Sequence, residues 1–412
     1  MPRHLVVAAL VLLACRAAAG VEITLVHDLD SARSATLAAL AAQFNGAGGH
    51  GRVVVEKSRA RGSGSGAAPR LVLLRDDDDM SPAGGRRILP LERFMARNGK
   101  PLDARRFYPA LREAAGDASG RLNALPMAYF LPVLYYNKDA LRSAGTPAAA
   151  PATWLTLQEA AGALHDAGME CPYTSSWPVW VHLENTSAQH HEPFVAPGPG
   201  ALRLAFNGLV NVKHVAVLSS WFRSGYFRLF GTADEADTRF ASGACGLLTS
   251  GSDARVRIAR EAGFDFGMAE LPYHDDVYGV TPASVAPGGG SLWVLAGGKR
   301  DEDRLAARFI AFLIEPSVQR RWVAESGFLP LGPSSGVAEV AGLGKPPASL
   351  LAVRLTERRR LADARVRSGD AYRAMRRIVG EELSAAWVDG KPAKTALDAA
   401  VARGNAALGA KR

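Results

Sequence analysis

A run of apolar and aromatic residues in the first third of the chain constrains the fold more than any other feature. Residues 126–139 read PMAYFLPVLYYNKD, and the stretch from Leu131 to Tyr136 predicts a short buried strand that closes at Asn137 into a turn or a helix start. One α/β unit of about domain size is predicted on each side of it. A stiff, short strand between two such units is what a hinge between lobes requires. A core strand of one large domain is the alternative.

Length and charge limit the classes of function. The 412 residues are too many for a single core, which predicts two or three domains. Hydrophobic residues make up 48% and charged residues 22%, as in soluble globular proteins. The net charge of +9 suggests nucleic acid or a membrane surface as a partner. The arginines are scattered, however, and no basic block interleaved with aromatic residues occurs, so we do not expect nucleic-acid binding.

Residues 1–20 have the pattern of a secretory signal peptide. A short basic start precedes an apolar run from Leu5 to Ala14, and small residues stand ahead of Val21. Cleavage near Gly20 would deliver the chain to the periplasm. Leu-Leu-Ala-Cys ending at Cys15 also resembles a lipobox, so a lipid anchor at Cys15 is the alternative. No later segment has the ~18 uninterrupted apolar residues of a membrane span.

The remaining cysteines form an even pair. Cys171 and Cys245 would face an oxidising compartment, where a disulfide between them is expected. No C-x-x-C motif or His/Cys cluster with metal-ligand spacing occurs, so we expect neither a metal site nor a cofactor.

The order of predicted elements indicates an α/β fold. A strand over 21–27, a helix over 34–44 and a strand over 52–56 predict the start of a parallel sheet. In the second unit, Thr153 is expected to cap a helix over 154–167. The apolar face of this helix would consist of Trp154, Leu157, Ala161 and Leu164.

Two stretches of the second unit have residue types suited to ligand binding. Trp177 and Trp180 lie three residues apart in a Ser/Pro-rich segment, which suits a stacking wall with an N–H donor at its edge. Core aromatics of a loop are the alternative. Ser250, Gly251 and Ser252 follow a predicted strand and precede a predicted helix, where backbone N–H groups and hydroxyls favour an anion. A plain helix cap is the alternative there.

Two stretches of the first unit add candidates. Glycines 288–290 precede a strand expected at 292–295, and glycine lets a backbone approach a ligand closely. Aspartates 76–79 follow a strand predicted at 70–74. Asp76 lies nearest to the carboxyl end of that strand, where α/β clefts bind ligands. The other three are interpreted as a solvated turn.

Several stretches together resemble the sn-glycerol-3-phosphate-binding proteins of bacterial ABC importers, within the extracellular solute-binding family 1 that also holds the maltodextrin-binding proteins. They extend through nearly the whole chain after Val21. They are PVLYYNKDAL (132–141), TWLTLQEAAGAL with GMECPY (153–173), WPVWVHLEN (177–185), FASGACGLLTSGS (240–252), GGGSLWV (288–294), ESGFLP (325–330) and RRIVGEELSAAW continuing to ARGN (376–405).

The resemblance implies an α/β, two-lobed periplasmic-binding-protein fold of type II, with the ligand in the cleft between the lobes. The expected division is 21–131 plus 276–332 for the first lobe and 132–275 plus 333–412 for the second. By position, the implied cleft residues are Asp76, Phe130, Trp177, Trp180, Ser250, Gly251, Ser252, Gly289, Phe328 and Arg376. Arg376 is the implied phosphate partner, because its charge is permanent and its donors fork onto two oxygens. A solvated helix face is the alternative for this arginine.

The chain departs from the family pattern in the first lobe. Asp76 stands where the family has a glutamate, Phe130 where it has a serine, and Phe328 where it has a tyrosine. A family tyrosine falls near Arg61, and a Gly/Ser-rich loop over 59–68 replaces the helix that follows it. Lost hydroxyls change which solutes a site discriminates. We therefore expect the phosphate end to persist and the polyol end to change.

The first hypothesis is a monomeric, non-catalytic binding protein that delivers sn-glycerol-3-phosphate or a glycerophosphodiester to an ABC permease. Another polar, sugar-like solute is the alternative ligand. A secreted hydrolase is disfavoured, because no G-x-S-x-G occurs and His190-His191-Glu192 does not match H-E-x-x-H. A remodelled sensor or interaction subunit is the third hypothesis.

Overall fold

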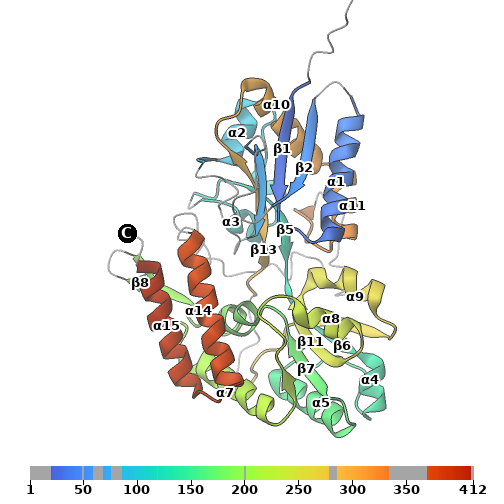
Figure 1. Cartoon of the computed structure of the whole chain (residues 1–412), viewed down its shortest axis with the longest axis vertical. Helices are drawn as coiled ribbons and strands as arrows, with labels where there is room; N and C mark the ends of the chain where they lie inside the picture. The colour runs from blue at the N-terminus through green and yellow to red at the C-terminus, as the bar shows by residue number, and fades with distance from the viewer. Residues whose placement is uncertain are drawn as a thin grey trace, which may run out of the picture.

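The computed structural model describes residues 20–48, 51–58, 68–75, 86–117, 119–198, 201–277, 285–333 and 369–409. The chain forms two lobes, each built on its own mixed sheet (Figure 1). In that view the first lobe lies at the top and the second at the bottom. Residues 1–19 of the predicted signal peptide, with Cys15 among them, and Asp76 lie outside the described residues.

The sheet of the first lobe takes strands from both ends of the sequence. Its order is β2-β1-β3-β13-β4, and β5 pairs with β13. The strands are β1 (Glu22–His27), β2 (Arg52–Lys57), β3 (Leu71–Arg75), β4 (Ile88–Leu89), β5 (Leu125–Phe130) and β13 (Gly288–Leu295). β1 is parallel to β2 and β3, as the strand-helix-strand order predicts, whereas β13 runs antiparallel to its neighbours. Among the described residues, the helices of this lobe include α1 (Ser31–Gly46), α2 (Leu91–Arg97), α3 (Pro109–Ala114), α10 (Arg300–Leu313) and α11 (Pro316–Ser326).

The sheet of the second lobe has the order β10-β7-β11-β6-β12. Its strands are β6 (Pro132–Asn137), β7 (Cys171–Ser175), β10 (Phe227–Arg228), β11 (Cys245–Gly251) and β12 (Phe266–Glu270), and a separate hairpin pairs β8 (Val195–Gly198) with β9 (Ala201–Leu204). The longer helices of this part are α4 (Lys138–Ser143), α5 (Trp154–Asp166), α7 (Leu209–Arg223), α8 (Glu235–Ala241) and α9 (Arg255–Glu261). The short α6 (Thr186–Gln189) precedes the β8–β9 hairpin.

The chain crosses between the sheets at Leu131. β5 ends at Phe130 in the first sheet and β6 begins at Pro132 in the second, with Leu131 buried between them. The predicted buried strand therefore exists as β6, and a second buried strand, β5, precedes it. The crossing itself is described, while the full boundaries of the two lobes stay predictions.

Helix α5 shows how local sequence sets an element. The Thr153 hydroxyl accepts a hydrogen bond from the Thr156 backbone N–H, and the Thr156 hydroxyl accepts one from the Thr153 N–H. This capping box satisfies two N–H groups that a helix start leaves unpaired. The predicted cap is confirmed, and so is the predicted apolar face, because the same four residues are the buried ones.

The disulfide between Cys171 and Cys245 is confirmed. The two residues are register partners in the parallel strands β7 and β11, and their Cα atoms lie 4.6 Å apart. This is inside the roughly 7 Å limit for bridging.

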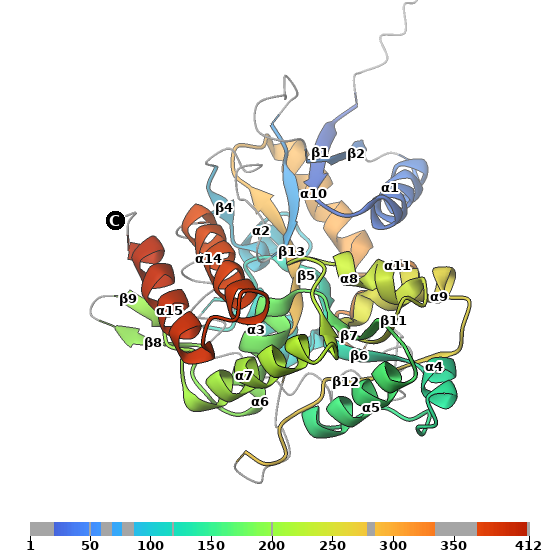
Figure 2. The same ribbon diagram turned by 60° about the horizontal axis from the view of Figure 1, so that its bottom comes forward.

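The C-terminal helices α14 (Gly369–Trp387) and α15 (Ala393–Gly409) pack against each other and against α7 of the second lobe (Figure 2). The Asn405 amide exchanges two hydrogen bonds with the Leu204 backbone of β9, at 2.7 and 3.2 Å. These contacts join the last helices to the second lobe.

One element starts earlier than the sequence predicts. The expected strand over 292–295 is β13, which begins at Gly288, so the prediction of a glycine loop ahead of the strand is wrong. Gly289 has φ +125°, and a Cβ there would come within 2.1 Å of the Ala128 carbonyl oxygen. The glycines therefore allow β13 to pack closely on β5, where any side chain would clash.

Candidate functional site

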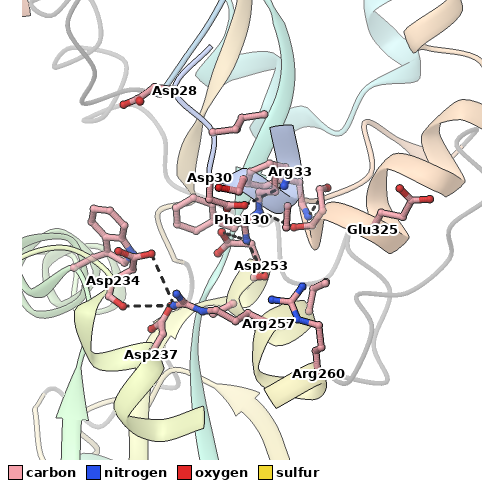
Figure 3. A pocket seen from close by; sticks show the side chains of 18 of the residues that line it. Asp28, Asp30, Arg33, Phe130, Asp234, Asp237, Asp253, Arg257, Arg260 and Glu325 are labelled. Atoms are coloured by element: carbon pink, nitrogen blue, oxygen red, sulfur yellow. Dashed lines mark hydrogen bonds and ion pairs between the residues drawn. The ribbon is translucent and has the colours of Figure 1, made fainter. Parts of the chain in front are cut away.

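Two compartments share one lining residue, Trp177; the first lies where the lobes meet, and the second is lined by second-lobe residues alone. The acidic compartment, about 510 Å³, is lined by both lobes, and its carboxylates are Asp28, Asp30, Asp234, Asp237, Asp253 and Glu325 (Figure 3). The arginine compartment, about 590 Å³, is lined by Trp177, Val179, Thr232, Ala233, Arg376, Arg377, Gly380, Glu381 and Ser384. Trp177 lines both compartments.

Trp177 is held in an unusual backbone conformation. Its φ is +54°, a region that side chains other than glycine rarely adopt. The Trp177 N–H donates to the Ala233 carbonyl at 2.8 Å, and its own carbonyl accepts from the Val181 N–H at 2.9 Å. Backbone strain of this kind persists where the surroundings fix the residue, and such residues cluster at ligand sites.

Trp180 has a different role from Trp177. Its side chain is 3% exposed, and its Nε1–H donates to the Ala286 carbonyl at 2.9 Å. Its ring is nearly perpendicular to that of Phe130, and the ring centres lie 5.2 Å apart. Trp180 therefore supports the chain that leads into β13, and it lines neither compartment.

The predicted aromatic residues of the first lobe reach the acidic compartment. Phe130 lies at the end of β5 and Phe328 just beyond α11, with nearly parallel rings 6.4 Å apart. Both rings are mostly buried. Together with Trp177, they give the acidic compartment an apolar wall.

The turn over 250–252 supports the wall from behind. The Ser252 N–H donates to the Leu131 carbonyl at 2.7 Å, and the Ser252 hydroxyl accepts from the Leu131 N–H at 3.1 Å. A Cβ on Gly251 would lie 2.7 Å from the Phe130 ring. Ser250, Gly251, Ser252 and Gly289 line neither compartment among the described residues, and their roles toward a ligand stay predictions.

Arg376 lines the arginine compartment but already has an anionic partner. Its Nη1 donates to Glu184, whose side chain is 3% exposed. Sequence reasoning missed Glu184, because it lies in a buried π-helical turn, Trp180–Asn185, far from Arg376 along the chain. The role of Arg376 as a phosphate partner stays a prediction.

Asp237 is the most perturbed carboxylate of the acidic compartment. It is 3% exposed and accepts hydrogen bonds from the Ser176 hydroxyl at 2.6 Å and from Arg257 Nη2 at 2.8 Å. Desolvation by burial raises the pKa of Asp237 to about 6, although the hydroxyl and the guanidinium favour the charged form. Its charge therefore changes in mildly acidic conditions. No short-range sequence signal marks this aspartate.

The sequence analysis also assigned no functional role to Asp30 or Arg33. Asp30 caps α1, and its carboxylate binds the Arg33 side chain at 2.6 Å. Burial opposes ionisation of Asp30, but the Arg33 charge and its hydrogen bonds outweigh burial and hold the pKa of Asp30 below its ordinary value. A cap followed by an arginine at the third position is common at helix starts, so the pattern gave no functional signal.

Two absences concern only the part of the chain that the structure describes. There, no group of three or more His, Cys, Asp or Glu side chains is arranged to hold a metal ion. Within the same residues, no helix has both the length and the apolar composition that a membrane crossing requires.

Comparison with known proteins decides the family. The model of the bacterial extracellular solute-binding proteins matches residues 33–345, about three quarters of the chain. This chain belongs to that family.

Curated relatives of this family member include two periplasmic proteins named sn-glycerol-3-phosphate-binding protein UgpB. The protein from Yersinia enterocolitica is 30% identical over 94% of this chain and 92% of its own length. The protein from Salmonella typhimurium is 32% identical over 84% of this chain and 80% of its own length.

Solved structures share the two-lobed fold, as the sequence predicts. UgpB from Mycobacterium tuberculosis in complex with glycerophosphocholine gives a TM-score of 0.72 at 19% identity, covering 95% of this chain and 99% of that one. The cyclic α-maltosyl-1,6-maltose binding protein from Arthrobacter globiformis gives 0.69 at 22% identity, covering 94% and 99%. At these identities the likeness shows the fold alone.

Proposed function

We propose that this family member is the periplasmic solute-capturing subunit of an ABC importer and that it binds sn-glycerol-3-phosphate or a glycerophosphodiester between its lobes. In this proposal the chain is a monomer that acts by binding, without catalysis, and delivers the solute to a membrane permease. The names of the curated relatives support the solute class. The family supports the transport role.

The observation that carries the proposal is the pair of compartments that share Trp177. Arg376 and Arg377 line one of them, and the other is rich in carboxylates. A phosphate on the arginine side would share the Arg376 guanidinium with Glu184. A carbon skeleton against Trp177 would then extend toward the acidic side.

This arrangement favours a phosphodiester with a cationic head over a simple phosphate monoester. Carboxylates outnumber the cations in the acidic compartment, whose basic residues are Arg33, Lys57, Arg257 and Arg260. Trp177 is only partly buried and offers a ring to which a quaternary ammonium is attracted, whereas Phe130 and Phe328 are 6% and 5% exposed.

A second candidate is a neutral, sugar-like solute. Aromatic faces beside carboxylates also suit a polyol, whose C–H groups pack on rings and whose hydroxyls donate to carboxylates. Glycerol-3-phosphate, glycerophosphocholine and maltose should therefore be titrated calorimetrically against the purified wild-type protein.

Variants test the placement of the phosphate. Loss of a charge-assisted hydrogen bond is worth about 1.5–3 kcal/mol, so Arg376→Ala should weaken binding of a phosphate-bearing solute about ten- to a hundredfold. Trp177→Ala should weaken binding by removing the ring that lines both compartments. Arg105→Ala is the control, because this arginine is 85% exposed and its partner Asp103 lies in the same lobe.

The results separate the hypotheses. Unchanged affinity in Arg376→Ala would remove the phosphate assignment. Binding of maltose alone would favour the sugar-like solute, and binding of none of the three would favour a sensor or interaction role.

A further inference from the structure

Arg33 reaches from the first lobe to the second. It lies in the first turn of α1, and its Nη2 donates to the Asp253 backbone carbonyl at 2.9 Å. The same nitrogen lies 2.8 Å from the Asp253 carboxylate oxygen Oδ2. Asp253 lies in the short 3₁₀ turn Ser252–Ala254 directly after β11, so a single guanidinium joins the two lobes across the acidic compartment (Figure 3).

The first lobe fixes the Arg33 side chain from three directions. Its Nε donates to the Ser326 carbonyl at 2.9 Å, Nη1 donates to the Asp30 carboxylate, and its Cζ lies 4.8 Å from the centre of the Phe328 ring. Ser326 is the last residue of α11, where helix carbonyls lack an intrahelical partner and favour a cation. The guanidinium is therefore held in place by its own lobe, with Nη2 directed at Asp253.

The second lobe presents Asp253 just as firmly. A Cβ on Gly251 would lie 2.2 Å from Asp253 Oδ1, so the carboxylate occupies space that only glycine leaves open. Across the interface, Gly327 has φ +78°, and a Cβ there would lie 2.6 Å from the Asp253 carbonyl oxygen. Glycines on both sides thus permit the lobes to approach closely at this point.

The position of the pair makes it sensitive to lobe movement. Arg33 and Asp253 are separated by 220 residues and belong to different lobes, so the distance between their charges depends on how the two lobes sit relative to each other. Their side chains are only 19% and 13% exposed, so water and salt screen the pair less than a surface ion pair.

We propose that Arg33 and Asp253 form an interlobe latch that stabilises the closed cleft before any solute binds. A binding protein that is already mostly closed spends less of its solute-binding free energy on closure, so the latch raises the apparent affinity for solute. This inference concerns closure and does not depend on which solute is captured.

The test is small-angle X-ray scattering of the solute-free protein. Arg33→Met keeps an unbranched side chain and removes the charge, and Asp253→Asn keeps the shape of the second partner. We expect the wild type to scatter as the closed form. Each variant should lower the ratio of closed to open molecules about ten- to a hundredfold and increase the radius of gyration.

Further variants separate a latch from a general loss of structure. The double variant should open no more than either single variant, because each change already breaks the same pair. Arg33→Lys should fall between wild type and Arg33→Met, since it keeps the charge but loses the forked geometry. Arg105→Met, which removes an exposed arginine of the first lobe, should scatter as the wild type.

Circular dichroism identifies any variant that fails to fold, and Asp253→Asn carries the test if Arg33→Met is such a variant. The latch is overturned if solute-free wild type is open, or if a folded Asp253→Asn has the same scattering profile as wild type. Failure of every candidate solute to bind would overturn the proposed function and leave the scattering result intact.

Discussion

The two lobes bury different chemistry. In the described part of the first lobe, the buried polar side chains are His27, Thr36, Arg70, Ser291, Gln319 and Ser326. The second lobe buries many more, and they are concentrated around β7, β11 and α7. The first lobe thus relies mainly on apolar packing, whereas the second combines apolar packing with an internal polar network and a disulfide.

A hydrogen-bonded row of side chains forms the centre of that network. His214 Nδ1 lies 3.0 Å from His274 Nε2, and His214 Nε2 lies 3.0 Å from His182 Nδ1. The row continues from His182 through Tyr173 and Thr249 to Ser175. The Trp154 ring covers it, with its centre 4.6 Å from that of the His214 ring.

The Thr249–Ser175 end of the row determines which atoms donate and which accept along it. The Thr249 hydroxyl donates to Ser175, so Tyr173 donates to Thr249. Each histidine then donates from Nε2 and accepts at Nδ1, which leaves His274 Nδ1 as an acceptor near Asp276, 4.0 Å away. His182 and His214 accept at Nδ1 within the row and are satisfied only while they are neutral, so the second lobe should depend on pH more than the first.

Lowering the pH should produce the largest difference in stability between the two lobes. Desolvation by burial lowers the pKa of His182 to about 3 and those of His190 and His274 to about 4, and it lowers the pKa of His214 as well. Lys213 also lowers and Asp276 raises the pKa of His274. The unfolded chain takes up protons near pH 6.5, so this stability is complete above that pH and is lost as the pH falls toward 4.

Asp237 opposes this trend, because its raised pKa of about 6 favours the folded form as the pH falls below 6. We expect a net loss of roughly 5 kcal/mol between pH 7 and pH 5 in the second lobe. Calorimetric melting of the protein at pH 7 and at pH 5 measures this loss of stability. Sequencing of proteolytic fragments identifies which lobe unfolds. His274→Gln should reduce the pH dependence and the exposed His165→Gln should not. Equal acid sensitivity of the two lobes would contradict the interpretation.

The disulfide should give the next largest difference. It closes a loop with a sequence separation of 74 residues, and such a cross-link typically contributes about 2–4 kcal/mol. Replacing Cys171 and Cys245 by alanine should therefore accelerate hydrogen exchange in second-lobe peptides. First-lobe peptides are the internal control, and matching acceleration in both lobes would refute a lobe-specific effect.

The first lobe has its own sensitive point in Arg70. This arginine is 4% exposed, pairs with Asp303 of α10 and lies over the Phe94 ring. Asp303→Ala would leave a buried charge without this partner and should cost about 1.5–3 kcal/mol in the first lobe, the usual range for a hydrogen bond to a charged group. Adding Arg70→Met should recover much of that loss. Urea unfolding followed at first-lobe peptides measures both, and no recovery in the double variant would speak against a charge-pair origin.

Removing the helix cap of α5 should have the smallest effect on the stability of either lobe. Thr153→Ala removes the capping box of α5 and should cost about 1 kcal/mol in the second lobe. Thr153→Ser keeps the hydroxyl and is the matched control. If both substitutions lower the midpoint of urea unfolding equally, the hydroxyl is not the cause.

Local patterns in the sequence identified what local chemistry controls. The Thr153 cap, the apolar face of α5 and the buried strand after Leu131 follow from spacing and propensity over a few residues. The disulfide followed from the pair of cysteines that remains after the predicted signal peptide, in a chain predicted to be secreted. The resemblance of ordered motifs identified the two-lobed family, because such motifs extend through the whole chain.

Tertiary structure alone decided which residues face the cleft. Trp177 and Trp180 look equivalent in the sequence, yet one lines both compartments and the other is buried against the chain leading into β13. Arg33 and Asp253, and the histidines of the buried row, lie far apart along the chain. Their interactions form only when the sheets bring those segments together. A one-dimensional pattern records periodicity and local propensity, whereas a charge pair or a buried hydrogen-bonded row depends on distances that the packing of both lobes sets.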